Sequence, residues 1–530
     1  MANSLKYSFF ACAILIAVLP NVALASEQSI TVVTHDNIDV KLIPEKGTCL
    51  KFKQIDVSGD LIFEPSKIEQ IILPFAYKCM GNQLIKSIMG HLNKSYADKG
   101  YITTQAYIPE QDFSSEIFKI QIVAGKIESI EIGKNQPLVK RQIITAFPIR
   151  SGDVLNMELL QQGIDNIKKR PSKKASIKLQ PGDKPGTSKV VVSATAEKNW
   201  RISAGTHHTR YKGISTKSND ITLELDNILG LNDGWKLTLG GGENSNSLRT
   251  SFTAPIAWAE FTFSSDYSEY LSVLTPTTEL FGQSWDLTAN MDYTIFRSPD
   301  DKIIANFSIA KKMSDRYINS VHLTPQRFTV AKFGIKHIKT AGAFSATTHL
   351  GISKGLSLLG AQRDPAIRTI STPRAQFSLL TANTDLTYVI KDVATLSSKW
   401  NVQWAPHALY SGQQMNLGGS SSVRGAGSAG MNVDIGITSQ HQVGFKLSNK
   451  SSPELSKILE KFEPYLFADA ALGKDIANSK KYYAASIGAG LKFEDKHFSF
   501  EASIAKPVFF RGVINASKSP EYKINATIKF

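Results

Sequence analysis

Segments in which apolar and polar residues alternate recur from Trp200 to the last residue, Phe530. The final segment is the most regular, because an apolar residue stands at every second position from Tyr522 to Phe530. A repeat of two is that of a β-strand with one apolar and one polar face, which suits a wall between lipid and water. No run of about eighteen consecutive apolar residues occurs in this region, so it predicts no transmembrane helix.

The number and length of these segments predict a closed, antiparallel β-barrel over residues 198–530. Counting them gives about sixteen strands, an even number that would enclose an aqueous lumen. Closure is expected because hydrocarbon offers no hydrogen-bond partner for an open sheet edge. A soluble β-sandwich would alternate as well. Here, however, long strands follow one another without a helical break, and short turns, as near Pro299, contrast with longer loops near Thr275 and Ala361.

The N-terminus has the layout of a cleaved secretory signal peptide over residues 1–25. An almost wholly apolar run extends from Phe9 to Leu19, and Ala23 to Ala25 is a small-x-small cleavage site. The apolar run is too short to span roughly 30 Å of hydrocarbon, which disfavours a retained membrane anchor. Residues 26–48 follow as an N-terminal extension with an extended pattern and no assigned role.

Removal of the signal peptide leaves two cysteines, Cys49 and Cys79. In an oxidising exported compartment we expect them to form a disulfide, because free thiols are rare there. The bridge would close a loop of about thirty residues, worth roughly 3–4 kcal/mol on the chain-entropy account.

The charge balance is basic, with 61 lysines and arginines against 46 aspartates and glutamates and a formal net charge of +15. Such a balance favours nucleic acid, anionic lipid or an acidic client, and export removes nucleic acid from the expected partners. One local cluster, Lys168 to Arg170 with Lys173 and Lys174, is interpreted first as a solvated face and second as a client or lipid contact.

Residues 49–124 and 125–197 show the same order of elements: strand, helix, helix, strand, strand. The longer helix of the first part carries apolar residues three and four apart on one face and stops at Gly100. A unit repeated at a period of about seventy residues indicates two copies of one small α/β module. Two soluble domains without a common task are the alternative.

Two short glycine motifs match enzyme signatures in spacing but not in context. Gly425 to Gly430 has the dinucleotide spacing without the strand before it and the helix after it. Gly351-Ile352-Ser353-Lys354-Gly355 has the nucleophile-elbow spacing, but it ends an alternating strand and runs into a polar loop. We expect a loop or turn at both, and no catalytic residue, metal site or cofactor.

A longer glycine-rich loop, at about 410–432, lies between the eleventh and twelfth candidate strands and contains Val423, Arg424 and Gly425. The loop could extend into solvent. If it folds into the lumen instead, Arg424 needs an acidic partner, because a poorly hydrated charge is costly unless paired. Asp469, in the Phe467-Ala468-Asp469 segment of the thirteenth candidate strand, offers one.

In this combination the chain resembles the outer-membrane transporters of two-partner secretion (TpsB type). These are the haemolysin-activator and filamentous-haemagglutinin transporters, within the superfamily that includes the barrel-assembly proteins. The Val423 to Gly425 loop resembles that family's pore loop. Gly100 to Asp112 resembles the signature of its first polypeptide-transport-associated (POTRA) domain, and Arg170 to Ser172 with Pro181-Gly182 resembles that of the second.

The resemblance implies two periplasmic POTRA domains, at 49–124 and 125–197, that bind an unfolded client. It also implies a pore in the bacterial outer membrane that secretes a large partner exoprotein of haemolysin or adhesin type. Arg424 would lie at the tip of a loop folded back into the pore and pair with Asp469. Other implied partners are outer-membrane lipid, lipopolysaccharide and the barrel-assembly machinery, which would recognise the C-terminal strand from Tyr522 to Phe530.

Two positions depart from the family pattern. Ala426 stands where an aromatic residue usually follows the arginine-glycine pair, and Ala471 stands where a glycine usually follows the strand aspartate. These departures leave the packing of the loop open. Three other functions also remain open: a barrel-assembly insertase, a passive porin, and a barrel-fused lipase that would use Ser353.

Overall fold

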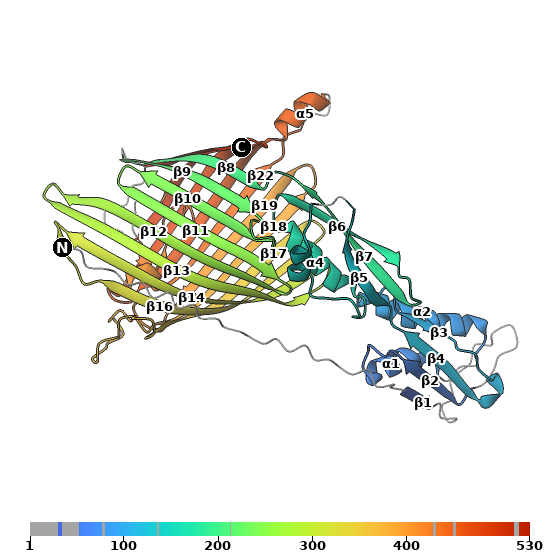
Figure 1. Cartoon of the computed structure of the whole chain (residues 1–530). Helices are drawn as coiled ribbons and strands as arrows, with labels where there is room; N and C mark the ends of the chain where they lie inside the picture. The colour runs from blue at the N-terminus through green and yellow to red at the C-terminus, as the bar shows by residue number, and fades with distance from the viewer. Residues whose placement is uncertain are drawn as a thin grey trace, which may run out of the picture. The chain divides into compact units, whose positions relative to one another are not determined.

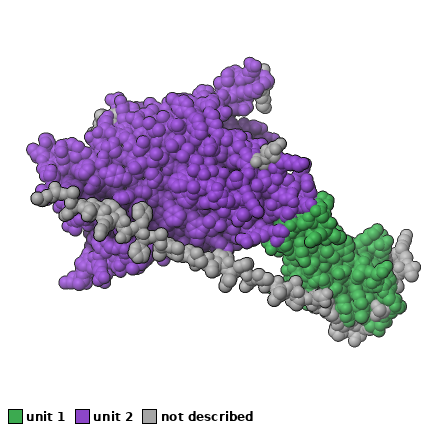
Figure 2. Space-filling model, in the orientation of Figure 1, with its two compact units in different colours: residues 1–128, 152–156, 181–188 green, residues 129–151, 157–180, 189–530 purple. Residues whose placement is uncertain are grey.

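The computed structural model describes residues 30–33, 52–76, 80–134, 137–211, 214–427, 431–448, 452–512 and 519–530. The chain forms two compact units (Figure 2): residues 1–128 with 152–156 and 181–188, and the remainder. The predicted signal peptide and the predicted disulfide between Cys49 and Cys79 lie outside the described residues and stay predictions.

The smaller unit contains the first α/β module. Its sheet has the order β1-β2-β4-β3, in which β2 and β4 are parallel. The strands are β1 (Ile30–Val33), β2 (Gln54–Gly59), β3 (Gln105–Tyr107) and β4 (Ile117–Val123), and the helices are α1 (Pro65–Ile72), η1 (Leu73–Phe75), α2 (Asn82–Asp98) and η2 (Phe113–Ser115). Ile88, Leu92 and Tyr96 line one face of α2 and are fully buried, because residues four apart share a helix face.

The second module repeats this order. Its elements are β5 (Lys126–Ile132), α3 (Lys140–Ala146), α4 (Met157–Lys168), β6 (Lys173–Pro181) and β7 (Thr187–Ala196), with sheet order β5-β7-β6. Leu160, Ile164 and Ile167 bury one face of α4. Gly163 on that face allows close packing, since a Cβ there would lie 2.2 Å from Cδ1 of Phe147.

The rest of the larger unit is a closed antiparallel barrel, seen as the long tilted strands of Figure 1. Sixteen long strands make up its described wall: β8 (Trp200–Tyr211), β9 (Ile214–Asp226), β10 (Gly234–Gly242), β11 (Ser245–Ile256), β12 (Ala259–Thr275), β13 (Thr278–Arg297), β14 (Asp301–Ile318), β16 (Gln326–Ala341), β17 (Phe344–Leu356), β18 (Ser378–Ile390), β19 (Ala394–Trp404), β22 (Ile435–Phe445), β23 (Phe462–Asp475), β24 (Lys480–Glu494), β25 (Phe498–Arg511) and β26 (Glu521–Lys529). The predicted fold class is thereby confirmed.

The C-terminal strand closes the barrel. Strand β26 pairs with β8 in a register that runs from Glu521 opposite Tyr211 to Lys529 opposite Ser203. The backbone N–H of Phe530 then donates to the carbonyl oxygen of Ile202 at 2.9 Å. The apolar side chains of β26, Tyr522 among them, are exposed on the outer face, as a lipid-facing strand requires.

One predicted loop is wrong. The connection near Thr275 is a tight turn of two residues, because Thr275 pairs directly with Thr278. The length that suggested a loop belongs to β12 and β13, which are 17 and 20 residues long. Near Ala361, by contrast, residues 357–377 do form a long irregular connection between β17 and β18.

Helices in the described part of the chain are too short or too polar to span a membrane. The longest is α2, with 17 residues. A short helix, α5 (Pro453–Leu459), lies in the connection between β22 and β23.

Candidate functional site

The predicted inward loop connects β19 to β22 over residues 405–434. It contains the short helix η3 (Ser411–Gln413) and a two-stranded ribbon of β20 (Met415–Asn416) and β21 (Asn432–Val433). Burial along β23 alternates strictly, and its odd-numbered residues from Tyr465 to Asp475 are the buried ones. The loop contacts these residues, so it lies against the inner face of the wall.

Arg424 and Asp469 meet at this face. The arginine Nε donates to Oδ2 of Asp469 at 2.8 Å, and Nη2 donates to Oδ1 at 2.7 Å. The backbone N–H of Arg424 also donates to Oδ2, at 3.0 Å. The carboxylate side chain has no exposed surface and the arginine side chain is 16% exposed. This bidentate, charge-assisted geometry is the strong form of an ion pair.

Two further groups hold the same guanidinium. Its Nη1 donates to Oε1 of Gln442 on β22 at 3.0 Å. Its carbon lies 3.6 Å from the ring centre of Phe467, within range of a cation–π interaction. Gln442 and Phe467 are register partners on neighbouring strands, so the loop tip is tied to both β22 and β23.

Small residues on β24 make room for the aromatic side chains of β23. A Cβ at Gly488 would lie 2.2 Å from Cζ of Phe467, and a Cβ at Gly490 would lie 2.3 Å from Cζ of Tyr465. The Tyr465 hydroxyl donates to Oε1 of Glu501 at 2.9 Å. The loop itself needs a glycine at Gly425, where φ is +86°.

The apolar side of the loop packs on the same wall. Leu417, Val423 and Ala426 are fully buried in one cluster with Ala471 and Ala484 of the barrel. Both departures from the family pattern, Ala426 and Ala471, therefore lie in a single cluster. Ala426, on the loop, is smaller than the aromatic residue usual in the family, and Ala471, on the wall, adds a methyl group where the family usually has glycine.

A second buried carboxylate, Asp434, fixes both ends of the loop and was missed from the sequence. Its Oδ1 accepts the N–H of Leu409 at 2.8 Å, and its Oδ2 accepts the N–H of Ile476 at 2.7 Å. Gln414 adds a third hydrogen bond to Oδ1, at 3.1 Å. Asp434 directly precedes strand β22, which begins at Ile435, and nothing in this local sequence predicts that the aspartate fixes the loop.

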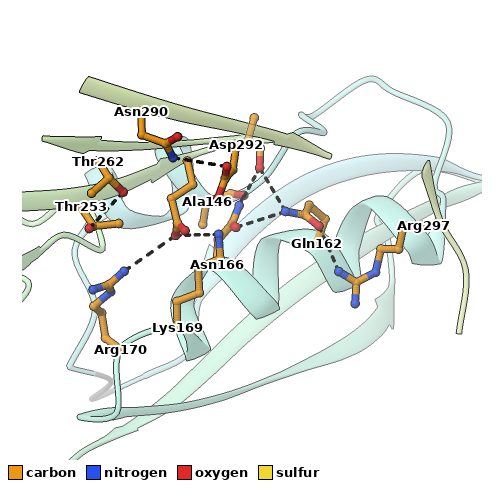
Figure 3. A network of polar contacts seen from close by, with 12 residues as sticks. Ala146, Gln162, Asn166, Lys169, Arg170, Thr253, Thr262, Asn290, Asp292 and Arg297 are labelled. Atoms are coloured by element: carbon orange, nitrogen blue, oxygen red, sulfur yellow. Dashed lines mark hydrogen bonds and ion pairs between the residues drawn. The ribbon is translucent and has the colours of Figure 1, made fainter. Parts of the chain in front are cut away.

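The second module is anchored to the turns of the barrel (Figure 3). Nδ2 of Asn166 on α4 donates to the carbonyl oxygens of Ala146 and Ala257, at 2.8 and 2.7 Å. Gln162, one turn earlier, donates to the same Ala257 oxygen at 3.3 Å. The N–H of Ala257 in turn donates to the carbonyl of Thr145 at 2.7 Å, so the β11–β12 turn is bound from both sides.

The neighbouring turns are held as well. Arg297, at the end of β13, donates to Oε1 of Gln162 at 3.0 Å and forms an ion pair with Asp165. In the β9–β10 turn, Asn232 and Gln142 of α3 exchange hydrogen bonds of 3.0 and 2.9 Å. Three successive turns of the barrel thus bind the helices of the second module.

The basic cluster of residues 168–174 is only partly the solvated face that the sequence suggested. Lys169 lies 2.8 Å from Glu260 of β12, and Arg170 lies 3.9 Å from the same carboxylate. These two cations belong to the anchor between module and barrel. Lys174 remains on the surface, paired with Glu197 at 2.7 Å.

The two enzyme-like motifs lie in barrel structure. Gly351 to Gly355 is part of strand β17, and Gly425 to Gly427 is part of the inward loop. Ser353 is buried on the lumenal face of a continuous strand, without the turn into a helix that an elbow needs. Among the described residues, no group of three or more His, Cys, Asp and Glu side chains could hold a metal ion.

Family models match the chain over most of its length. The model described as "Haemolysin secretion/activation protein ShlB/FhaC/HecB" matches residues 186–493. The "POTRA domain, ShlB-type" model matches residues 50–125, and a further POTRA domain model matches residues 126–181.

The chain is similar to the outer membrane transporter CdiB of Dickeya dadantii, with 26% identity over 393 residues, which is 72% of this chain and 69% of that protein. It is similar to the hemolysin transporter protein ShlB of Serratia marcescens, with 26% identity over 338 residues, which is 61% of this chain and 59% of that protein.

Among solved structures, CdiB from Escherichia coli matches with a TM-score of 0.82 at 20% identity and 94% coverage of both chains. BamA from Haemophilus ducreyi lacking POTRA domains 1-3 matches with a TM-score of 0.52 at 11% identity, over 91% of this chain and 100% of that chain. At these identities the likeness shows the fold.

Proposed function

Because the chain belongs to the ShlB/FhaC/HecB family of haemolysin secretion/activation proteins, we propose that it exports one large partner exoprotein, of haemolysin or adhesin type, by two-partner secretion. The barrel lies in the bacterial outer membrane and its two POTRA domains lie in the periplasm. The observation that carries the proposal is a loop seated on the inner wall by the Arg424–Asp469 pair. A seated loop that can be released is what a regulated protein pore needs.

The first POTRA domain offers a surface for an unfolded client. Strand β3 is an edge of its sheet, and Ile102, Tyr107 and Ile108 expose large apolar side chains at or next to that edge. An extended client segment could add to the edge through backbone hydrogen bonds and place alternate side chains against these residues. The opposite edge already carries β1, which pairs with β2.

The Arg424–Asp469 pair would act as a releasable contact, here called the latch, that holds the tip of the loop on the inner wall. Removing one partner of a buried pair costs about 3–5 kcal/mol, because the other charge stays buried without compensation. The Arg424→Ala substitution should therefore unseat the loop while the wall of the barrel, which does not depend on it, still forms. Arg424→Lys keeps the charge but loses the bidentate fork, and we expect an intermediate defect.

The test is secretion of a large exoprotein co-expressed with this chain as its candidate partner, measured against the amount of folded barrel in the outer membrane. Arg424→Ala should insert at the normal level and fail to secrete. Lys399→Ala, a substitution of an exposed lumenal lysine on β19, is the matched control and should secrete normally. Normal secretion by Arg424→Ala would refute the latch.

A barrel-assembly insertase is the second candidate, favoured by the fold likeness to BamA. Depletion of an insertase would lower many outer-membrane proteins, whereas depletion of a translocator should remove one exoprotein from the medium. A passive porin would keep its conductance after deletion of residues 50–196. The family is one of transporters, and hydrolase activity of the purified protein would be needed to revive a role for Ser353.

We also propose that lipopolysaccharide and phospholipid surround the apolar outer face, and that the barrel-assembly machinery inserts the chain by recognising β26. The exposed apolar residues Tyr522, Ile524 and Ile528 share the lipid-facing side of that strand, and Phe530 follows it. Such a strand at the end of a chain presents a ready pairing surface during insertion.

A further inference from the structure

The connection between β22 and β23 is unusually long for its end of the barrel. Successive strands alternate in direction, so this connection lies at the same end as the turns that bind the second POTRA domain. Five other connections at that end have two or three residues each: 257–258, 298–300, 342–343, 391–393 and 495–497. Short turns are the rule on the periplasmic side of an outer-membrane barrel. Residues 446–461 depart from this rule and include helix α5.

Helix α5 has one apolar face, and that face is exposed. Leu455 and Ile458 are 43% and 55% exposed. Ile458 and Leu459 lie three and four residues after Leu455, so the three side chains share one face of the helix. Lys457 and Glu460 are exposed on the opposite face. The helix is therefore amphipathic, although it is short.

A helix as short as α5 needs a surface to pack on. It has seven residues, whereas isolated helices of fewer than about twelve residues are marginal in water. The hydroxyl of Ser452 caps it by accepting the N–H of Leu455 at 3.4 Å, which supplies only one extra hydrogen bond. Across the described residues of the protein, nothing buries any residue of α5. We therefore expect its apolar face to be covered from outside the chain.

A belt of phenylalanines lies where α5 joins the barrel. Phe445 ends β22 and Phe462 begins β23, and the belt continues with Phe493 of β24 and Phe498 of β25. Ring centres lie 4.8 Å apart between Phe462 and Phe493, and 6.0 Å apart between Phe493 and Phe498. These residues lie on the outer face, since the odd-numbered residues of β23 face the lumen and Phe462 pairs with Phe493. Aromatic residues at the ends of lipid-facing strands mark the membrane–water interface.

The end of α5 is fixed at the level of this belt. Leu459 precedes Phe462 by three residues, which span at most about 11 Å. The carbonyl of Lys461 accepts the N–H of Glu494 at 3.0 Å, and its Nζ lies 3.0 Å from Oδ1 of Asp495 in the next turn. In Figure 1 the helix lies outside the outline of the barrel strands. It therefore stands beside the lipid-facing surface.

We propose that α5 is an interfacial anchor whose apolar face, formed by Leu455, Ile458 and Leu459, inserts among the phospholipids of the periplasmic leaflet. An interfacial helix buries its apolar face at the boundary of headgroups and acyl chains and keeps its polar face in water. Lipid is the occupant because the apolar face continues a belt that already faces lipid. The anchor rests on the outer-membrane location and does not depend on the secreted client.

The anchor would act on the two strands that hold the inward loop. Helix α5 joins β22 to β23, and these strands carry Gln442 and Asp469, the hydrogen-bond partners of Arg424. A helix seated in the leaflet would fix the periplasmic ends of both strands. The wall under the latch would thereby be held in place while the loop tip moves.

The test uses the purified full-length protein in vesicles of phosphatidylethanolamine and phosphatidylglycerol. An environment-sensitive fluorophore on Ile458→Cys should lose about half or more of its emission when some of the lipid carries a spin label near the headgroup end of an acyl chain. Lys457→Cys, on the opposite face of the same helix, is the matched control and should lose little. The parent chain, labelled in the same way, gives the background from its own cysteines, and heat-modifiable migration shows that each variant is folded.

A photo-crosslinking amino acid at position 458 separates lipid from other occupants, and we expect it to give no protein adduct. Absence of quenching at Ile458→Cys, or equal quenching at both positions, would overturn the anchor. A crosslink from position 458 to a POTRA domain, to a second copy of the chain or to another protein would also overturn it. The apolar face would then be a surface for docking protein.

Discussion

Asp434 and Asp469 are both buried, but they hold the inward loop in different ways. Asp434 accepts one backbone N–H from the start of the loop, at Leu409, and one from Ile476 just after β23, so its contacts do not depend on a partner charge. Asp469 is bound mainly by the side chain of Arg424, which can leave as a unit. We infer that Asp434 keeps the base of the loop fixed while the tip at Arg424 is the part that can move.

In the first POTRA domain, the buried side chain of Tyr96 makes stability depend on pH. Its ring stacks on Phe63 with centroids 4.3 Å apart, but its hydroxyl has no hydrogen-bond partner among the described residues. Burial raises the pKa of Tyr96 to about 12. Between the ordinary pKa near 10 and this value, the unfolded chain ionises and the folded one does not. The free energy of unfolding should therefore fall as pH rises from 10 to 12.

We expect Tyr96→Phe to remove that fall, which is at most about 3 kcal/mol, and to cost little at pH 8 because no hydrogen bond is lost. Urea titrations followed by helical circular dichroism at pH 8 and pH 11 measure both effects. Tyr107→Phe, at an exposed tyrosine of β3, should leave the pH dependence unchanged. An identical pH dependence in Tyr96→Phe and the native chain would contradict the account.

At the scale of elements, helix α4 holds the second POTRA domain to the turns of the barrel, and we call this set of contacts the α4 clamp. Gln162 and Asn166 are one turn apart on the same face and are almost fully buried, so both amides are desolvated by the contact with Ala257 (Figure 3). Unpaired, each buried group would cost about 1–3 kcal/mol. The clamp explains why this helix carries polar residues on a buried face.

Asn166→Ala should loosen the clamp, because the carbonyls of Ala146 and Ala257 lose a donor. We expect faster hydrogen exchange in α4 and in the β11–β12 turn, and reduced secretion, with the barrel still inserted. Lys168→Ala, at an exposed position of the same helix, serves as the control for helix stability. Unchanged exchange at the turn in Asn166→Ala would show that the clamp does not hold the domain.

Much of this arrangement could be predicted from sequence, and the remainder depends on long-range contacts. The period-two pattern of β26 and the helical spacing of Ile88, Leu92 and Tyr96 are local features of the sequence. They therefore predict the strand and the helix directly. Asp434 and the α4 clamp join residues far apart in the chain, and no local pattern encodes them. The loop predicted near Thr275 is a two-residue turn, because a run of threonine and proline residues does not by itself show where strand pairing begins.

At the scale of the whole molecule, the two sides of the lumen differ. The wall from β22 to β25 holds the loop with small residues and the Arg424–Asp469 pair. The wall from β9 to β12 borders a cavity of about 720 Å³ rich in hydroxyl groups, including Ser247, Ser251 and Ser264. Hydroxyl groups both donate and accept hydrogen bonds, so we expect this wall to contact an extended client backbone with little selection for its sequence.

The central claim is that the client crosses the membrane through this lumen. A photo-crosslinking amino acid at Ser264 on the lumenal face of β12, compared with Phe263 on its 53% exposed outer face, tests it during active secretion. The account predicts crosslinks to the exoprotein from position 264 and none from position 263. Crosslinks from position 263 alone, or from neither position while secretion continues, would contradict it.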